Sequence, residues 1–236
     1  MMPADDDPVL DDPVGQSLGT RHAHLARRLG RAATYRAGVA TFSAVSTEPD
    51  ARDWADLAEL LGPGAFADMF SCPAIPPADW EPVFTLEGRQ MIWPGGIHPT
   101  EPDTEPGSTG LVELGPDSVP DMLDLVARTE PGPFWPRTRE LGTYVGIRVD
   151  GTLVAMAGER LRPPGWTEIS AVCTAPEARG RGHAARLVGA LAARIAARGD
   201  RPFLHVAEKN TRAIALYERL GFKTRRQVTF RGFRTP

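Results

Sequence analysis

The chain has few cysteines, few lysines and no excess of positive charge. Its two cysteines, Cys72 and Cys173, are far apart and lack metal-ligand spacing, so we predict neither a disulfide framework nor a metal site. Lys209 and Lys223 are the only lysines among 27 basic residues, and the formal net charge is −3. A chain with this charge has no overall attraction to nucleic acids or anionic membranes, so we expect neither as a partner.

Long apolar runs are also missing. None approaches the roughly 18 residues that a membrane helix needs, and the acidic opening MMPADDDPVLDD is unlike the basic start of a signal peptide. We therefore expect a cytoplasmic protein. The preference for arginine over lysine, together with 24 glycines and 23 prolines, is typical of a GC-rich bacterial genome rather than of a binding function.

A stretch rich in proline, glycine and acidic residues divides the chain. Residues 95–108, GGIHPTEPDTEPGS, have the composition of a connector. We place the domain boundary there, with a smaller N-terminal α/β region at residues 1–109. In that region the apolar spacing predicts helices at 18–31 and 53–61 and short strands at 81–93, but no chemical motif.

Residues 110–236 show a clear succession of helices and strands. The strongest local signal is Asp150-Gly151, a two-residue turn between alternating apolar runs, which predicts a β-hairpin. Asn210 is expected to cap a later helix that ends at Gly221. The other predicted elements are helices at 120–129 and 183–198, strands at 168–172 and 202–206, and a strand pair at 228–233.

A glycine-rich turn precedes the helix predicted at 183–198. In Arg179-Gly180-Arg181-Gly182-His183-Ala184, the glycines allow an anion to approach the unpaired amides of a helix start, and the arginines add positive charge. A plain strand-to-helix connection is an equally good interpretation of this turn alone. The residue pattern of this turn fits neither a P-loop, which needs Gly-Lys-Ser/Thr, nor a dinucleotide-binding loop, which is followed by an acidic residue about 20 positions later.

A second motif, later in the chain, supports a functional interpretation of this turn. Residues 179–184 resemble the Arg/Gln-x-x-Gly-x-Gly/Ala pyrophosphate motif of the GNAT superfamily of N-acetyltransferases, and Asn210-x-x-Ala-x-x-Leu-Tyr217-x-x-x-Gly-Phe222 is similar to its second signature. Both lie in the family's order, and the resemblance covers residues 110–236. Within the superfamily, the chain looks most like the branch with glycine N-acyltransferase-like C-terminal domains. The N-terminal region is then open to interpretation as a degenerate half of the same fold.

This resemblance implies a mixed, mostly antiparallel sheet flanked by helices, and acetyl-CoA (coenzyme A) as the cofactor. Backbone groups would hold the pantetheine arm and the pyrophosphate, Asn210 would assist, and Tyr217 would protonate the departing thiolate. The spacing of seven places Asn210 and Tyr217 almost on one helix face. The implied cofactor-binding residues are Val172, Cys173, Thr174, Arg179, Gly180, Arg181, Gly182, His183, Ala184, Asn210 and Tyr217.

The acceptor site is harder to place. Glu168 is our candidate base, because similar enzymes carry a carboxylate on this strand; a solvent-facing glutamate is the alternative. Phe134 and Arg137, in the loop PGPFWPRT, are candidates for substrate binding, with Arg137 pairing a substrate carboxylate; a stiff connector is the alternative.

The sequence thus predicts an enzyme that transfers acetyl from acetyl-CoA directly to the primary amine of a small molecule or amino acid. A non-catalytic acyl-CoA-binding or sensory protein and a protein acetyltransferase are the alternatives. The identity of the acceptor, the use of longer acyl-CoAs and the presence of a homodimer are left open.

Overall fold

The computed structural model describes residues 7–94 and 110–236. The predicted connector at 95–108 therefore lies outside the described residues. No helix of the described part is long and apolar enough to cross a membrane. The described helices are α1 (Pro13–Gly19), α2 (Ala51–Leu61), α3 (Val119–Thr129), α4 (His183–Ala197) and α5 (Thr211–Arg219).

Two sheets organise the described residues. A small sheet has the order β1-β2-β3, and a large one the order β4-β11-β5-β10-β9-β8-β7-β6. In the large sheet β9 and β10 are parallel and all other neighbours are antiparallel. The strands are β1 (Ala26–Leu29), β2 (Ala32–Tyr35), β3 (Ser43–Ala44), β4 (Phe66–Met69), β5 (Glu81–Ile92), β6 (Leu111–Glu113), β7 (Tyr144–Val149), β8 (Thr152–Glu159), β9 (Trp166–Thr174), β10 (Arg201–Ala207) and β11 (Lys223–Arg234). This mixed, mostly antiparallel sheet with flanking helices confirms the predicted fold class.

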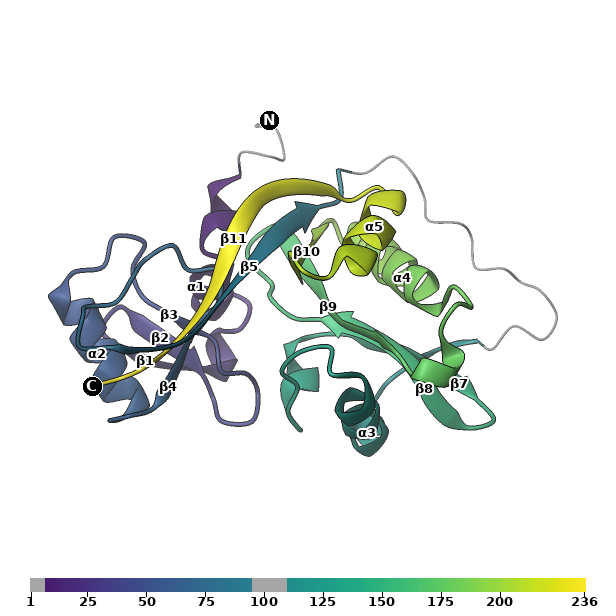
Figure 1. Ribbon diagram of the computed structural model, residues 1–236, viewed down its shortest axis with the longest axis horizontal. Coiled ribbons are helices and arrows are strands. Elements are labelled where there is room, and N and C mark those ends of the chain that lie inside the picture. Colours follow the sequence, from purple (N-terminus) through teal and green to yellow (C-terminus); the bar gives the residue numbers. More distant parts are fainter. Residues whose placement is uncertain (1–6, 95–109) are drawn as a thin grey trace.

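The large sheet crosses the boundary that the sequence predicts. β5, from the N-terminal half, pairs with β10 on one side and with β11 along its whole length on the other. The long strands β5 and β11 arch from the N-terminal region to α5 (Figure 1). The two halves therefore share one sheet, while the division at residue 109 and the idea of a degenerate half fold stay predictions.

Local patterns predict most elements of the C-terminal half. Asp150 and Gly151 take positive φ angles of 49° and 80°, as the two-residue hairpin turn requires. The Asn210 side chain caps α5 by accepting a hydrogen bond from the Ala213 amide at 3.2 Å. The predicted strand pair at 228–233 is instead part of the single strand β11.

The N-terminal half departs further from its pattern. The helix predicted at 18–31 is wrong: α1 ends at Gly19, and β1 pairs with β2 through a turn at Gly30, whose φ is +53°. Hairpin pairing with the following strand thus overrides helical spacing. The short strands predicted at 81–93 form the one long strand β5.

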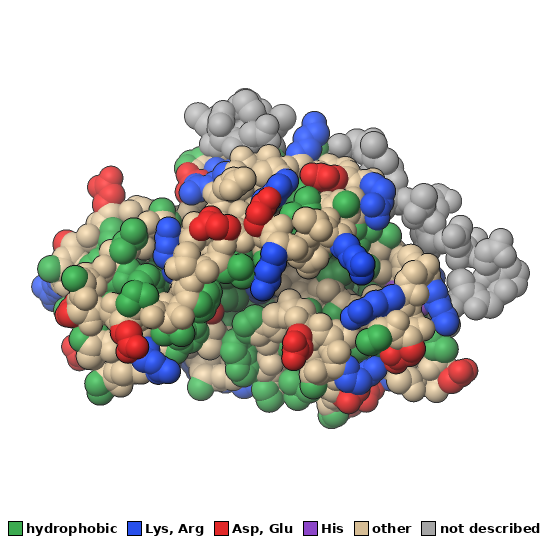
Figure 2. Space-filling model, viewed as in Figure 1, with side chains coloured by type: hydrophobic (Ala, Val, Ile, Leu, Met, Phe, Trp, Pro, Cys, Tyr) green, Lys and Arg blue, Asp and Glu red, His purple; other side chains and the backbone are tan. Residues whose placement is uncertain are grey.

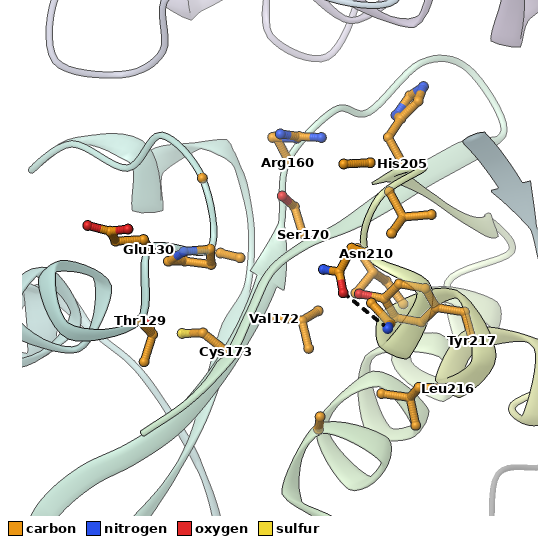
Figure 3. A pocket seen from close by; sticks show the side chains of 18 of the residues that line it. Thr129, Glu130, Arg160, Ser170, Val172, Cys173, His205, Asn210, Leu216 and Tyr217 are labelled. Carbon is orange, nitrogen blue, oxygen red and sulfur yellow. Dashed lines mark hydrogen bonds between the residues drawn. The ribbon is translucent and has the colours of Figure 1, made fainter. Parts of the chain in front are cut away.

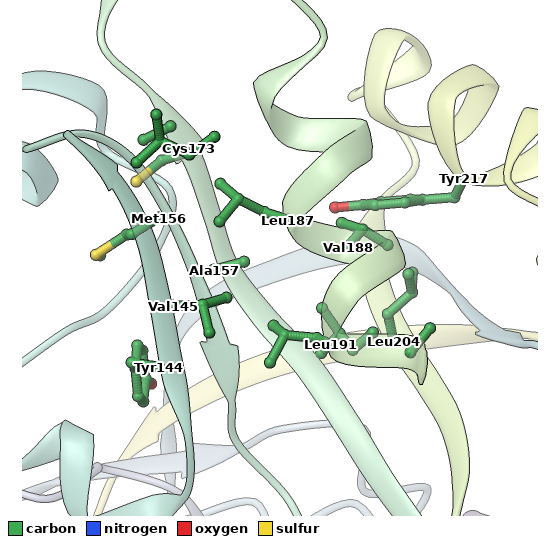
Figure 4. Packing of buried hydrophobic residues seen from close by; sticks show 14 of the residues in the cluster. Tyr144, Val145, Met156, Ala157, Cys173, Leu187, Val188, Leu191, Leu204 and Tyr217 are labelled. Carbon is green, nitrogen blue, oxygen red and sulfur yellow. The ribbon is translucent and has the colours of Figure 1, made fainter. Parts of the chain in front are cut away.

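The core continues through both halves. In the C-terminal half, Leu187, Val188 and Leu191 of α4 pack against buried side chains of β7 to β10 (Figure 4). A second cluster joins α1 and the small sheet to Ile92 of β5 and Phe203 of β10, both fully buried. Because this cluster is built from both halves, the N-terminal region is packed against the end of the large sheet where β9 and β10 pair.

Candidate active site

Two parallel strands part at the centre of the large sheet. β9 and β10 pair only from Trp166 to Glu168 on one side and from Arg201 to Phe203 on the other. Beyond these pairs both strands continue, and a pocket of about 450 Å³ lies between them. This face of the molecule is hollowed, with Lys and Arg side chains near the rim (Figure 2).

A bulge shapes β9 where it borders the pocket. Ala171 has a φ of +52°, which is unusual for a residue with a side chain, and the register with β8 shifts between Ser170 and Cys173. Because β10 has separated by this point, the edge of β9 from Ile169 to Thr174 has no strand partner there. Its backbone donors and acceptors are available to an extended ligand arm.

The glycine turn lies next to the end of β9. Gly180 and Gly182 have φ angles of +78° and +74°, and a Cβ on either would meet no atom within 4 Å. α4 starts directly afterwards, so its first amides have no intrahelical partner. Open space in front of free amides at a helix start is the geometry that an anion such as pyrophosphate requires.

Charged and polar groups surround this turn. The turn borders a second pocket, of about 320 Å³, which shares Thr174, Arg179 and Ala184 with the first. His183, the first residue of α4, has a buried Nε2 without a partner among the described residues. Burial and neighbouring arginines lower the pKa of His183, so its ring is neutral at pH 7. Arg181 is exposed and lines neither pocket.

α5 brings Asn210 and Tyr217 to the opposite wall. Both line the first pocket, facing β9 (Figure 3). Burial raises the pKa of Tyr217 to about 12, despite the opposing effect of Arg160, so its hydroxyl keeps its proton throughout the neutral range. Across the pocket, Val172, Cys173 and Thr174 of β9 complete the lining. The fold therefore brings the predicted cofactor-binding residues of both sequence motifs together at the two pockets, with the exception of Arg181.

Glu168 has an environment that the sequence does not suggest. It is fully buried, so the solvent-facing alternative is wrong. Arg160 binds both carboxylate oxygens, at 2.9 and 2.7 Å, and His205 Nδ1 lies 2.6 Å from Oε1. Burial alone would raise the pKa of Glu168, but Arg160 and His205 lower it to about 2. Such a carboxylate accepts a proton poorly at neutral pH, so this geometry favours a positioning role over the base role expected above.

The candidate acceptor loop is only partly at the pocket. Pro131, Gly132 and Pro133 line it, whereas Phe134 packs edge-to-face on Tyr144 beside a small adjoining cavity. Arg137 lies outside the pocket and binds both carboxylate oxygens of Glu140, at 2.7 and 2.8 Å. Its bidentate donor pair is therefore already used within the protein.

Other pocket residues are missed by the sequence. Arg160 follows β8 directly, and a Glu-Arg pair at the end of a strand is typical of a solvent-exposed strand end. Its pocket neighbours Phe70, Leu86, His205 and Phe230 come from four separate segments. No periodicity links such residues, so only the packing of the N-terminal half against the sheet could reveal them.

Comparisons with known proteins agree with this geometry. Residues 144–231 match the family described as FR47-like protein. The N-alpha-acetyltransferase RimI of Mycobacterium tuberculosis is 35% identical over 130 residues, covering 51% of this chain and 81% of that protein.

Solved structures extend the likeness to the whole chain. A putative acetyltransferase of the GNAT family from Novosphingobium aromaticivorans is 39% identical, with a TM-score of 0.84, and the match covers 98% of this chain and 100% of that one. A GCN5-related N-acetyltransferase from Kribbella flavida is 17% identical with a TM-score of 0.58 and covers 96% of each chain, which is a likeness of fold.

Proposed function

Because the chain belongs to the GNAT family of acetyltransferases, we propose that it transfers an acetyl group from acetyl-CoA directly to the primary amine of a small molecule or amino acid. The observation that carries this proposal is the continuity of the two pockets. The gap between β9 and β10 opens onto the glycine turn, so one extended ligand can reach from the helix start to the splayed strands.

The residues present fit acetyl-CoA, which supplies the acetyl group as a reactive thioester when bound. The unpaired edge of β9 at Val172 to Thr174 offers backbone hydrogen bonds to an amide-bearing arm. Gly180, Gly182, His183 and Ala184, at the start of α4, line the second pocket, where an anion can lie against their amides. The unpartnered His183 Nε2 lies at the same turn.

Three groups of the chain then have distinct tasks. A backbone amide near Val172 or Cys173 polarises the carbonyl that the amine attacks. The Tyr217 hydroxyl donates a proton to the sulfur as the carbon–sulfur bond breaks, and is then reprotonated from solvent, while the nitrogen of the attacking amine releases its proton to solvent. Cys173 is buried, and burial raises the pKa of its thiol, so it serves through its backbone rather than as a nucleophile.

The nature of the acceptor distinguishes this proposal from its alternatives. The RimI relative is named an N-alpha-acetyltransferase, and a protein N-terminus also carries an α-amine, so a protein acceptor is the second candidate. Residues of the N-terminal half, Phe70 and Leu86, line the end of the pocket near Arg160, and this favours a small acceptor. A non-catalytic acyl-CoA sensor would need no Tyr217 in the pocket. The glycine N-acyltransferase-like branch and a homodimer stay predictions.

We expect Gly182→Asp to abolish detectable acetyl-CoA binding, measured by calorimetry at millimolar ligand. A carboxylate there would lie at the helix start and repel the pyrophosphate, and the φ of +74° disfavours any side chain. Wild-type protein should also melt at a higher temperature when acetyl-CoA is present. Absence of binding to the wild type would remove the basis of the proposal.

Gly64 provides the matched control. It has a similar φ of +63° and similarly open space, but lies between α2 and β4, away from both pockets. Gly64→Asp should therefore carry the same backbone strain and bind acetyl-CoA as the wild type does. If Gly182→Asp folds and also keeps its affinity, the pyrophosphate binds elsewhere.

A further inference from the structure

One end of the first pocket, away from the glycine turn, has a wall of its own. Phe70, Leu86 and Phe230 give it an apolar surface, with the rings of Phe70 and Phe230 stacked at a centroid distance of 4.6 Å. Arg160 is the charged residue beside them, and its side chain is only 14% exposed. A nearly buried guanidinium in an apolar pocket needs partners for its donors.

Arg160 is held by a carboxylate and by two aromatic rings, those of Phe42 and Phe70. Its Nε and Nη2 bind Glu168, and its guanidinium carbon lies 4.4 Å from the centre of the Phe70 ring. Its Nη1 has no hydrogen-bond partner among the described residues. The arginine is thus fixed in position with Nη1 unpaired among the described residues, and its side chain lies beside Ser170 and His205 at the pocket that it lines (Figure 3).

A chain of hydrogen bonds holds Glu168 in turn. Arg225 donates to Gln90 Oε1 at 2.9 Å, which orients the amide so that Gln90 Nε2 donates to Leu10 O and toward His205 Nε2, at 2.8 and 3.2 Å. His205 must then carry its proton on Nδ1 and donate it to Glu168. Burial lowers the pKa of His205, so the ring is neutral and adds no charge.

No net positive charge gathers at this end of the pocket. Glu168 offsets Arg160, and Asp68, which receives a hydrogen bond from Thr41 at 2.8 Å, is buried with its pKa raised to about 6, so it is still mostly ionised at pH 7. Selectivity therefore comes from the unused Arg160 edge rather than from net charge. A carboxylate is the group that accepts most strongly from a guanidinium in a site of low dielectric constant.

We propose that the acceptor is an amino acid whose carboxylate binds Arg160 Nη1 and whose apolar side chain packs against Phe70, Leu86 and Phe230. This rests on the proposed acetyl transfer and names its substrate class. The carboxylate at Arg160 directs the neighbouring amine back along the pocket toward Tyr217. Acceptors without a carboxylate leave the Arg160 edge unpaired, which costs binding.

Three probes that differ only in this group test the proposal: L-phenylalanine, L-phenylalaninamide and 2-phenylethylamine. With acetyl-CoA and the full chain, kcat/KM measured by thiol release should be at least about tenfold higher for the acid. Binding provides a second readout. In the presence of CoA, N-acetyl-L-phenylalanine should bind at least about tenfold more tightly than its amide in calorimetry. Equal or stronger binding of the amide overturns the inference even if acetyl-CoA binds as expected.

Variants identify the arginine responsible. Arg160→Lys keeps a positive charge beside Glu168 but loses the paired N–H donors of the guanidinium. The ratio of kcat/KM for L-phenylalanine to that for its amide should therefore fall about tenfold, while acetyl-CoA affinity is retained. Arg148 is half-buried, lies outside the first pocket and is bonded to Asp121, so Arg148→Gln is the control and should keep the preference. Loss of the preference in Arg137→Gln instead would assign the carboxylate to the loop and overturn the role of Arg160. If Arg160→Lys does not fold, the wild-type probe comparison still decides.

Glu168→Gln separates positioning from proton transfer. As a positioning residue, Glu168 affects the acceptor only through Arg160, so we expect KM for L-phenylalanine to rise about tenfold without a shift in the pH midpoint of kcat/KM. Circular dichroism confirms that the variant is folded. A profile displaced to higher pH, where the amine is neutral without help, would make Glu168 the base and contradict the positioning role.

Discussion

Replacing Tyr217 with phenylalanine is expected to lower kcat by about 10² to 10⁴ while acetyl-CoA affinity changes only a few fold. The ring is almost fully buried against Phe222, so its packing is preserved, and only the hydroxyl at the pocket is lost. Burial raises the pKa of Tyr217 to about 12, and the same dry surroundings favour protonation of a thiolate formed beside it.

Steady-state kinetics and calorimetry on the same preparation measure both quantities. Tyr35→Phe is a suitable control because it removes another buried hydroxyl, bonded to His22 at 2.8 Å and outside the first pocket. That variant can lose stability but should keep its kcat. An unchanged kcat in Tyr217→Phe would assign Tyr217 to packing and leave water as the proton source.

A chain starting at residue 110 is expected not to fold, although both sequence motifs lie within it. Deletion removes β5, which separates β10 from β11, and exposes two strand edges at the centre of the sheet. It also removes Met91 and Ile92, both fully buried, and uncovers Phe203 and Trp166. The remaining strands would lack both their pairing and a large part of their core.

Circular dichroism, cooperative thermal unfolding and acetyl-CoA binding of the purified fragment provide the test. Adding residues 7–94 as a separate chain is the control, because a complementing fragment should restore binding if the missing strand is the cause. A fragment that is folded and binds acetyl-CoA alone would show that the C-terminal half is independent of β5.

The proposed cofactor side of the site can largely be predicted from the sequence, because local chemistry determines it. A helix start, two glycines and an N-cap asparagine each depend on residues within one turn, and the fold positions them as their motifs predict. The acceptor side depends on contacts between distant segments. The role proposed for Arg160 depends on its contacts with Glu168 and Phe70 and, through Glu168, on His205. The residues next to Arg160 in the sequence predict none of these contacts.

Glu168 illustrates the same limit from another direction. Its position on a strand makes it a functional candidate, but the pKa of a carboxylate depends on its neighbours in space. Two of those neighbours are His205, on β10, and Arg160, directly after β8. Ala171 is similar, because no residue preference announces a positive φ inside a strand. The sequence thus predicts which strand borders the site, but neither the bulge at Ala171 nor the lowered pKa of Glu168.

The position of β5 also determines when the molecule can fold. Glu81 pairs with Arg234 and Ile92 with Lys223, so a strand made early in synthesis pairs with residues made much later. Pairing across such separations is slow, because the entropy of closing a long loop is lost before the contacts form. On the ribosome, β5 would have both edges unpaired, and Met91 and Ile92, which belong to two different core clusters, would be uncovered. The nascent chain would therefore expose aggregation-prone surface until β10 and β11 are made.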